Sequence, residues 1–407
     1  MPRFDHRAIP IVLVAVTIDA IGFGIVMPVL PALITRLGHA SLEEATRIGG
    51  WLLAAFAVAQ FFAGPVLGQL GDRFGRRPVL IASMVAFALD YALMAFAPTL
   101  AWLFVGRIVA GIAGATYGPA GAVIADVSPP DRRAAAFGLL GASFGIGFII
   151  GPAMGGIAAG FGIHAPFVVA AVLAAANAVA MIVLLPETLD DDHRRPFRWR
   201  EAHVVGSFRP LFAAGNALPL LVAWFLWQLG SMVYPATWSF WATIRFDWTP
   251  GQIGWSLAWV GLLTVIAQVG LTDRVVRRFG EVGAAAIALF AGAACLIACA
   301  FATAGWQVYA IFLVGSLGAF AYPALSGLAS RMVDASRQGA LQGGLASINS
   351  VAEIIGPVLA AQSLAFGTGK GFPGAAFLVA GALVATAGVL ILGAARRVPS
   401  LPAEATP

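Results

Sequence analysis

Charged residues are scarce in this chain of 407 amino acids. Asp, Glu, Lys and Arg together make up 11% of the residues and hydrophobic ones 60%, against about 25% and about 45–50% in soluble domains. A water-soluble protein of this size could not hide so much apolar surface from water. The composition therefore excludes a soluble globular protein and predicts an integral membrane protein.

Lysine and cysteine are nearly absent. Lys370 is the single lysine, and the basic charge comes from arginines in short loops without interleaved aromatic residues, which argues against a nucleic-acid partner. Cys295 and Cys299 are four residues apart in an apolar run, so they share a helix face as small packing residues and predict no disulfide framework. The apolar runs contain no nucleophile–base pair and no set of metal ligands. We therefore expect no enzyme, no catalytic or metal-binding residues and no cofactor.

Twelve apolar segments are long enough to cross a bilayer, since a helix needs about 20 mostly apolar residues for this. Numbered as spans 1–12, they cover residues 8–35, 48–70, 78–97, 100–123, 134–160, 165–185, 217–244, 251–273, 282–302, 306–332, 340–366 and 372–394. The longest polar interruption follows span 6. We expect an all-α membrane protein with a six-helix bundle in residues 1–185, a linker in 186–215, a second six-helix bundle in 216–396 and a short tail in 397–407.

Arginine placement predicts the orientation of the chain. With the amino terminus inside, 19 of the 24 Lys and Arg residues fall in cytoplasmic loops and tails, and Arg107 falls within a span. The four that fall outside are Arg36, Arg47, Arg245 and Lys370. This bias follows the positive-inside rule, so we expect both termini in the cytoplasm.

The two halves of the chain repeat a charged turn and a Gly-Pro pair. The turn reads GQLGDRFGRRPVL at residues 68–80 and GLTDRVVRRFG at 270–280. An anchor that keeps a loop in the cytoplasm is the simple explanation for such a turn. Parallel six-helix repeats around a central cavity are, however, typical of one transporter architecture. The matching pairs are Asp72-Arg73 with Asp273-Arg274, and Gly151-Pro152 with Gly356-Pro357.

Four ionisable side chains lie inside apolar spans: Asp19, Asp90, Arg107 and Glu353. An unpaired arginine at the centre of a membrane helix costs about 2.5–3.5 kcal/mol or more, so such groups face a partner or water and mark functional sites. We expect Arg107 to meet Asp19 across the first half of the chain. A carboxyl group in such surroundings can take up and release a proton. A purely structural ion pair is the alternative, for Arg107 and for Asp90.

Glycines and tryptophans are concentrated in particular spans. In span 5, GFIIGPAMGG at 147–156 has a glycine at every fourth position and a proline that bends the helix, although packing accounts for the glycines alone. Seven of the eleven tryptophans lie between Trp224 and Trp259, in spans 7 and 8 and the turn that joins them. An aromatic belt at the outer interface explains Trp241 and Trp248. Trp224 and Trp227 suit either the core or a cavity for a planar, largely apolar substrate.

The chain resembles the major facilitator superfamily over essentially its whole length. Within that superfamily it resembles the twelve-span drug–proton antiporters, and the tetracycline efflux proteins in particular. The strings that carry the resemblance are DAIGFGIVMPVLP (19–31), GDRFGRRPVL (71–80), LDYALMAFAP (89–98), GRIVAGIAGAT (106–116), IADV (124–127), GFIIGPAMGG (147–156), HAPF (164–167), LLPET (184–188) and SRMVDASRQGALQG (330–343).

The resemblance implies a role for several residues by their position. Membrane-embedded polar residues that are important in that family match Asp19, Gln60, Asp90 and Arg107. A cytoplasmic gate would comprise Gly71, Asp72, Arg73, Arg76, Arg77, Asp126, Asp273 and Arg274. A pattern typical of proton-coupled antiporters comprises Gly147, Gly151, Pro152, Gly155 and Gly156. In that family the exported species is a tetracycline chelated to a divalent cation and exchanged for a proton.

The second half departs from the family pattern. Thr264 stands where the tetracycline pumps of Gram-negative bacteria have a histidine, and span 9 lacks the family's proton-linked aspartate. Glu353 is an additional acid in span 11 and shares a helix face with Asn349 and Gln342. We expect Glu353 to share proton coupling with Asp19. The alternative is that Glu353 pairs with an arginine near the cytoplasmic side and holds the halves together.

The sequence thus predicts an inner-membrane antiporter with two pseudo-symmetric six-helix halves around a central cavity. It would export an amphipathic aromatic drug, preferably of the tetracycline type, in exchange for protons. A multidrug or metabolite exporter is the alternative within transport, and a non-transporting sensor or scaffold the alternative outside it. We expect a monomer in the lipid bilayer. Proton coupling would rest on Asp19, Asp90, Arg107 and Glu353, and the substrate cavity on Gln60, Trp224, Trp227, Gln228 and Asn349.

Overall fold

The computed structural model describes residues 7–114, 117–129, 132–190, 192, 194–197, 218–331 and 338–395. All regular elements within these ranges are helices. Most of the predicted linker 186–215 and all of the predicted tail 397–407 lie outside the described residues.

The first half of the chain contains eight helices in its described ranges. They are α1 (Ala8–Val26), α2 (Leu30–Gly38), α3 (Leu42–Phe74), α4 (Arg76–Phe96), α5 (Leu100–Ala113), α6 (Tyr117–Val127), α7 (Arg133–Ala159) and α8 (Ala165–Leu184). The described part of the second half contains α10 (Leu218–Ser231), α11 (Val233–Phe246), α12 (Pro250–Phe301), α13 (Gly305–Gly315), a 3₁₀ segment (Ser316–Phe320), α14 (Ala321–Ser330), α15 (Gln338–Gly369) and α16 (Ala375–Ala395).

The number of membrane spans agrees with the prediction once one long helix is divided. In the described part of the chain, 11 helical stretches are long and apolar enough to cross a membrane. The longest, α12, has 52 residues and contains Gly280, whose φ of 68° lies outside the helical region. Because only glycine adopts such a φ readily, the chain turns there. Spans 8 and 9 are therefore separate, and the twelve predicted spans are confirmed.

Spans 1, 7 and 10 are broken near their middle, each next to a proline. The break after α1, in span 1, contains Pro28. Pro235 lies near the start of α11, just after the break in span 7, and Pro323 lies near the start of α14, just after the break in span 10. Proline lacks a backbone N–H and clashes with the preceding turn, so it interrupts a helix. Discontinuous helices at equivalent positions of two repeats are typical of transporter binding sites.

Spans 2 and 8, which are equivalent in the two halves, are capped in the same way at their N-termini. The Ser41 hydroxyl accepts from the backbone of Glu44 while the Glu44 carboxylate accepts from the backbone of Ser41, and Thr249 and Gln252 form the same reciprocal pair. A capping box of this kind satisfies two otherwise unpaired donors at a helix start.

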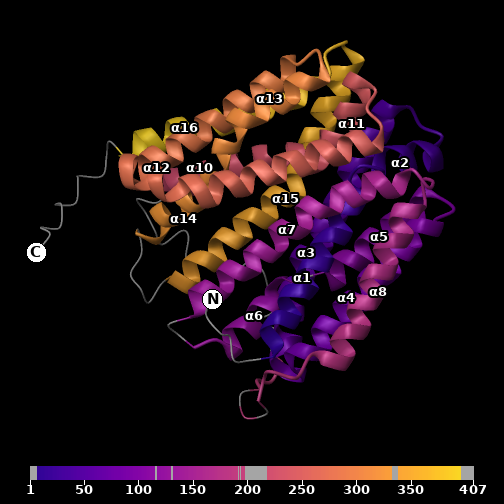
Figure 1. Cartoon of the computed structure of the whole chain (residues 1–407), viewed down its shortest axis with the longest axis vertical. Helices are drawn as coiled ribbons and strands as arrows, with labels where there is room; N and C mark the ends of the chain where they lie inside the picture. The colour runs from indigo at the N-terminus through magenta and orange to yellow at the C-terminus, as the bar shows by residue number, and fades with distance from the viewer. Residues whose placement is uncertain are drawn as a thin grey trace, which may run out of the picture.

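The two six-span bundles lie side by side, with the second bundle above the first in Figure 1. Within the first bundle α1 packs on α7 and α4 on α8, and within the second α12 and α10 pack on α16. Two seams join the bundles, α7 with α12 and α3 with α15. The bundles meet at the end that carries α2 and α11, whereas α6 and α14 lie at the other end (Figure 1).

Candidate functional site

A buried ion pair joins α4 to α5. The Asp90 carboxylate is fully buried and contacts the Arg107 guanidinium, whose side chain is 7% exposed. The guanidinium also lies 5.6 Å from the centroid of the Phe56 ring. Gly106 makes room for the pair, since a Cβ there would lie 2.6 Å from Asp90 Oδ1.

The expected meeting of Arg107 with Asp19 is therefore wrong. Asp90 and Arg107 lie at similar distances along the chain from the short turn that joins α4 to α5. These two helices pack directly on one another. Asp19 lies on α1, which packs mainly on α7 and α8. It is partly exposed, and within the described part of the chain it has neither an ion pair nor a hydrogen bond.

A cluster of aromatic and amide side chains from spans 7, 10 and 11 contains three of the five residues predicted to line the substrate cavity. Trp224 Nε1 donates a 2.7 Å hydrogen bond to Asn349 Oδ1. The Trp224 ring packs edge-on against Trp227 at 5.8 Å and against Tyr322 at 5.5 Å between centroids. Tyr322 was not found from the sequence, because it belongs to no motif that would single it out.

Three further polar side chains that were predicted for the site are partly exposed. Gln60, Gln228 and Glu353 make no hydrogen bond to the described part of the chain. Glu353 also has no ion pair there, so within the described residues it does not hold the halves together through an arginine. Polar groups without protein partners are typical of a water-accessible cavity.

The predicted belt tryptophans pack in the core of the second half instead. Trp241 is fully buried, and its ring lies 4.6 Å from that of Phe377. Trp248 is 9% exposed and packs on Phe246 and Tyr309. A belt residue would expose its ring to the membrane interface, which these two do not.

The predicted gate residues of the first half form a compact charge cluster. Arg76 contacts Asp72 at 2.6 Å and Asp126 at 3.2 Å, so one arginine bridges the ends of three helices. Arg77 donates a 2.5 Å hydrogen bond to the carbonyl oxygen of Ile182. The Arg73 guanidinium lies 4.9 Å from the neighbouring Phe74 ring.

Glu187 completes this cluster and was missed from the sequence. Its carboxylate accepts hydrogen bonds from the backbone N–H groups of Arg76 at 2.8 Å and Arg77 at 3.2 Å. An acid at a helix N-terminus satisfies free donors and interacts favourably with the helix dipole. The string LLPET at 184–188 contained this residue but gave no indication of what it would contact.

The second half carries the same cluster in a shifted register. Within the described residues, Asp273 and Arg274 form hydrogen bonds only to their own helix: the Arg274 guanidinium donates to the Gly270 carbonyl, and the Asp273 carbonyl accepts from Arg277. The ion pair at this end joins Glu281 to Arg331 at 2.9 Å.

Equivalent positions in the gate are 205 residues apart, like the Gly-Pro pairs, because the turn of the second half is four residues longer. The matching turn glycines are Gly75 and Gly280, both with positive φ. Arg76 then corresponds to Glu281, and Asp126 corresponds to Arg331. The pair therefore recurs with its charges exchanged. Asp72-Arg73 and Asp273-Arg274 precede the turn and remain 201 residues apart, so this pairing does not extend beyond the turn.

The glycines of span 5 bring backbones together on two sides of α7. Gly147, Gly151 and Gly155 face the backbone of α1, at distances that leave no room for a side chain. Gly156 faces α12, where a Cβ would lie 2.9 Å from the Pro250 carbonyl oxygen. Backbones can approach this closely only where glycine omits the side chain.

The second seam repeats this contact. A Cβ at Gly50 of α3 would lie 2.9 Å from the carbonyl oxygen of Pro357 in α15. Pro357 is the equivalent of Pro152, whose carbonyl oxygen faces Gly254 of α12. Both seams are therefore closed tightly at the end that carries α2 and α11. A cavity of only about 30 Å³ remains there beside Arg107.

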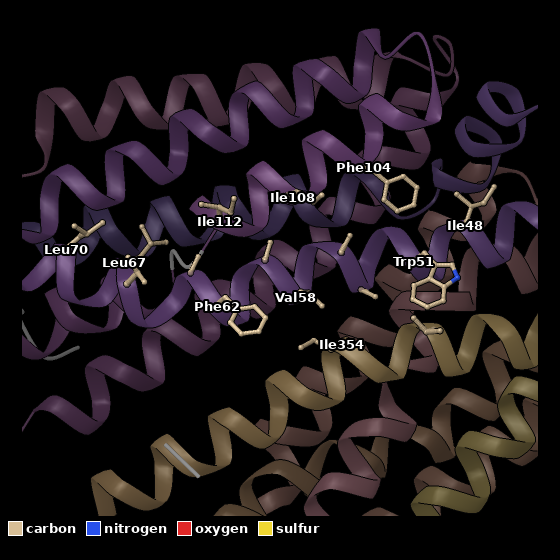
Figure 2. A pocket seen from close by; sticks show the side chains of 16 residues that line it. Ile48, Trp51, Val58, Phe62, Leu67, Leu70, Phe104, Ile108, Ile112 and Ile354 are labelled. Atoms are coloured by element: carbon tan, nitrogen blue, oxygen red, sulfur yellow. The ribbon is translucent and has the colours of Figure 1, made fainter. Parts of the chain in front are cut away.

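A groove of about 1000 Å³ runs along the seam of α3, α5 and α15. Trp51, Phe62 and Ile354 are among its lining residues, and Figure 2 shows them between the helices of the two halves. All the lining side chains are apolar, as expected for a surface that faces hydrocarbon.

Two six-span bundles with broken helices at equivalent positions and a buried ion pair define a secondary transporter. The chain belongs to the Major Facilitator Superfamily, whose family model matches residues 12–357.

The relatives that the chain resembles are resistance proteins. It is 42% identical over 355 residues to tetracycline resistance protein, class C, of Escherichia coli, covering 87% of this chain and 89% of that protein. It is 36% identical over 351 residues to the class B protein of Escherichia coli, covering 86% of each. It is 28% identical over 363 residues to multidrug resistance protein 2 of Bacillus subtilis, covering 87% and 88%.

Solved structures support the fold. The human organic anion transporter MFSD10 has a TM-score of 0.72 at 24% identity, covering 96% of this chain and 100% of that one. The nucleoside transporter NupG has a TM-score of 0.76 at 13% identity, covering 95% and 99%.

Proposed function

We propose that this protein is an inner-membrane antiporter that exports a tetracycline-type drug in exchange for protons. The observation that carries this proposal is the set of charged side chains inside the first bundle, together with an aromatic cluster in the second. Similarity to tetracycline resistance proteins over most of both chains supports the drug class.

The intramembrane charges divide into paired and unpaired groups, which suits different roles. Removing one partner of a buried ion pair leaves an uncompensated charge and costs about 3–5 kcal/mol. The Asp90–Arg107 pair therefore serves as a fixed part of the site. Asp19 and Glu353 are partly exposed and have no ion pair within the described residues, so they are better placed to gain and lose a proton.

Alternating access needs a seal at each end of the cavity. The glycine seams close the end that carries α2 and α11. Arg76 and its partners would close the opposite, predicted cytoplasmic end during each cycle. The ion pairs of Arg76 are partly exposed, so each contributes more than a fully exposed pair, which is worth about 0–1 kcal/mol, but still little enough to open during the cycle.

A multidrug exporter is the second candidate. It is supported by the similarity to multidrug resistance protein 2 and by Thr264, which replaces the histidine expected by resemblance to tetracycline pumps. Such an exporter would accept aromatic compounds without a bound divalent cation, whereas a tetracycline pump would take the chelate as its substrate.

Uptake of tetracycline into inside-out membrane vesicles tests the proposal. The membrane potential supplies about 2.3 kcal/mol per 100 mV for one charge, and the pH difference about 1.4 kcal/mol per unit. We expect uptake to require an acidic vesicle interior and to stop when a protonophore is added. Uptake that continues with the protonophore would contradict proton antiport. Parallel assays with other aromatic drugs, each with and without Mg²⁺, separate the two candidates.

A further inference from the structure

A second cavity, of about 240 Å³, lies inside the second bundle, between α10, α11, α12, α13, the 3₁₀ segment and α16. Among the predicted cavity residues it is lined only by Trp227, which also packs in the central aromatic cluster. The cavity therefore adjoins the central site. Its lining contains no Asp, Glu, Lys, Arg or His; the polar side chains are those of Ser231, Tyr234, Thr264, Cys295 and Ser316.

The place of this cavity in the fold corresponds to that of the buried ion pair. The turn between α4 and α5 has its equivalent in the turn between α12 and α13, because both pairs of helices end and begin 205 residues apart. In this register Asp90 corresponds to Cys295 and Arg107 to Phe312, and both of these line the cavity. Where the first half holds two charges, the second half leaves a neutral space.

The Thr264 hydroxyl is free, unlike those of six other helical threonines; Thr35 and Thr272 also lack a hydrogen-bond partner, but neither lines this cavity. A threonine within a helix commonly donates to the carbonyl oxygen four residues earlier. Thr264 makes no hydrogen bond to the described part of the chain, although it lines the cavity. The threonines that do form such a bond are Thr17, Thr46, Thr237, Thr243, Thr368 and Thr386.

The other polar groups complement Thr264. The Tyr234 hydroxyl lies 3.7 Å from Cys295 Sγ, and sulfur is a weak hydrogen-bond partner that a ligand oxygen can replace. Ser231 and Ser316 donate their hydroxyl hydrogens at 2.8 Å to backbone carbonyls, which leaves their oxygens as acceptors. The cavity thus offers two donors and two acceptors without any formal charge.

The size of the cavity and its aromatic walls indicate which class of ligand it can hold. Pockets for whole drug-sized molecules measure about 300–1000 Å³, so 240 Å³ fits only part of such a molecule. Trp227, Tyr234 and Phe312 provide flat apolar surfaces beside the hydroxyls. A ring whose edge carries hydroxyl and carbonyl groups matches both features.

We propose that this cavity is a substrate subsite that binds the hydroxyl- and carbonyl-bearing edge of an aromatic ring through neutral hydrogen bonds. The inference rests on the proposed drug export and names the part of the drug that the second half recognises.

Equilibrium binding of tetracycline to the purified full-length protein tests this subsite. We expect Thr264→Val, which keeps the shape and removes the hydroxyl, to raise the Kd about tenfold. Thr386→Val is the matched control, because Thr386 bonds its own helix and does not line the cavity, and its Kd should equal that of the wild type. An unchanged Kd in Thr264→Val would overturn the subsite while leaving export intact. A wild-type protein that binds no tetracycline would overturn the proposed function and the subsite together.

The native cysteine provides a second readout. In a Cys299→Ala variant Cys295 is the single thiol of the chain, and we expect N-ethylmaleimide to label it and saturating tetracycline to slow the labelling at least fivefold. In Thr264→Val a higher drug concentration should be needed for the same protection. A thiol that never reacts, or that reacts equally fast with bound drug, would contradict the subsite.

Discussion

The two halves of the protein share one fold but carry different side chains at equivalent positions. In the first half, equivalent positions of the membrane interior hold Asp19, Asp90 and Arg107. The second half has Trp224, Cys295 and Phe312 at the positions 205 residues later. The second half therefore repeats the fold of the first half but not its charged site. The difference indicates that most of the intramembrane charge lies in the first half, with Glu353 as the exception, and that the equivalent positions of the second half are neutral.

The gate ends of the two halves differ in the opposite way, by exchange of sign. Arg76 lies between two acids in the first half, whereas Glu281 contacts Arg331 in the second. Exchanging both charges preserves the attraction within each half. The two ends also become complementary to one another, which favours contact between them when this end of the cavity closes.

The largest effect should follow from breaking the buried pair. Arg107→Gln leaves the Asp90 carboxylate buried without a counter-charge, at a cost of about 3–5 kcal/mol. We expect drug export to be abolished and the melting temperature of the purified protein to fall. Phe312→Leu, at the equivalent position of the second half, removes one aromatic wall of the proposed subsite; it should raise the drug concentration needed for half-maximal export but leave export at saturating drug largely intact. Equal loss in both variants would mean that the halves do not differ as described.

Smaller effects should follow from reversing charges in the gate. Arg76→Glu places three acids together, and we expect transport to slow about tenfold, which corresponds to about 1.4 kcal/mol. Arg331→Glu should slow it only about twofold, because the Arg331 side chain is 70% exposed and such pairs contribute little. Initial rates of vesicle uptake measure both. The double variant Glu281→Arg with Arg331→Glu should recover the wild-type rate, and failure to recover would contradict a simple ion pair.

Much of the architecture could be predicted from the sequence because span length and apolar composition are imposed by the bilayer. The twelve spans are confirmed. The partner of Arg107 could not be predicted, since helix spacing places a charge in depth but does not say which helices pack together. The register of the second gate was hidden by its longer turn, and the shared positive φ of Gly75 and Gly280 shows which residues of the two turns correspond.

The central claim is that proton coupling depends on the unpaired acids, Asp19 above all, and substrate recognition on neutral groups. Measuring both in one preparation tests it most directly: proteoliposomes with Asp19→Asn, or with Glu353→Gln, are assayed for tetracycline accumulation driven by a pH gradient and for exchange of labelled against unlabelled drug. We expect Asp19→Asn to lose accumulation and Glu353→Gln to reduce it, while both retain exchange. Normal accumulation by well-folded Asp19→Asn protein would contradict the account.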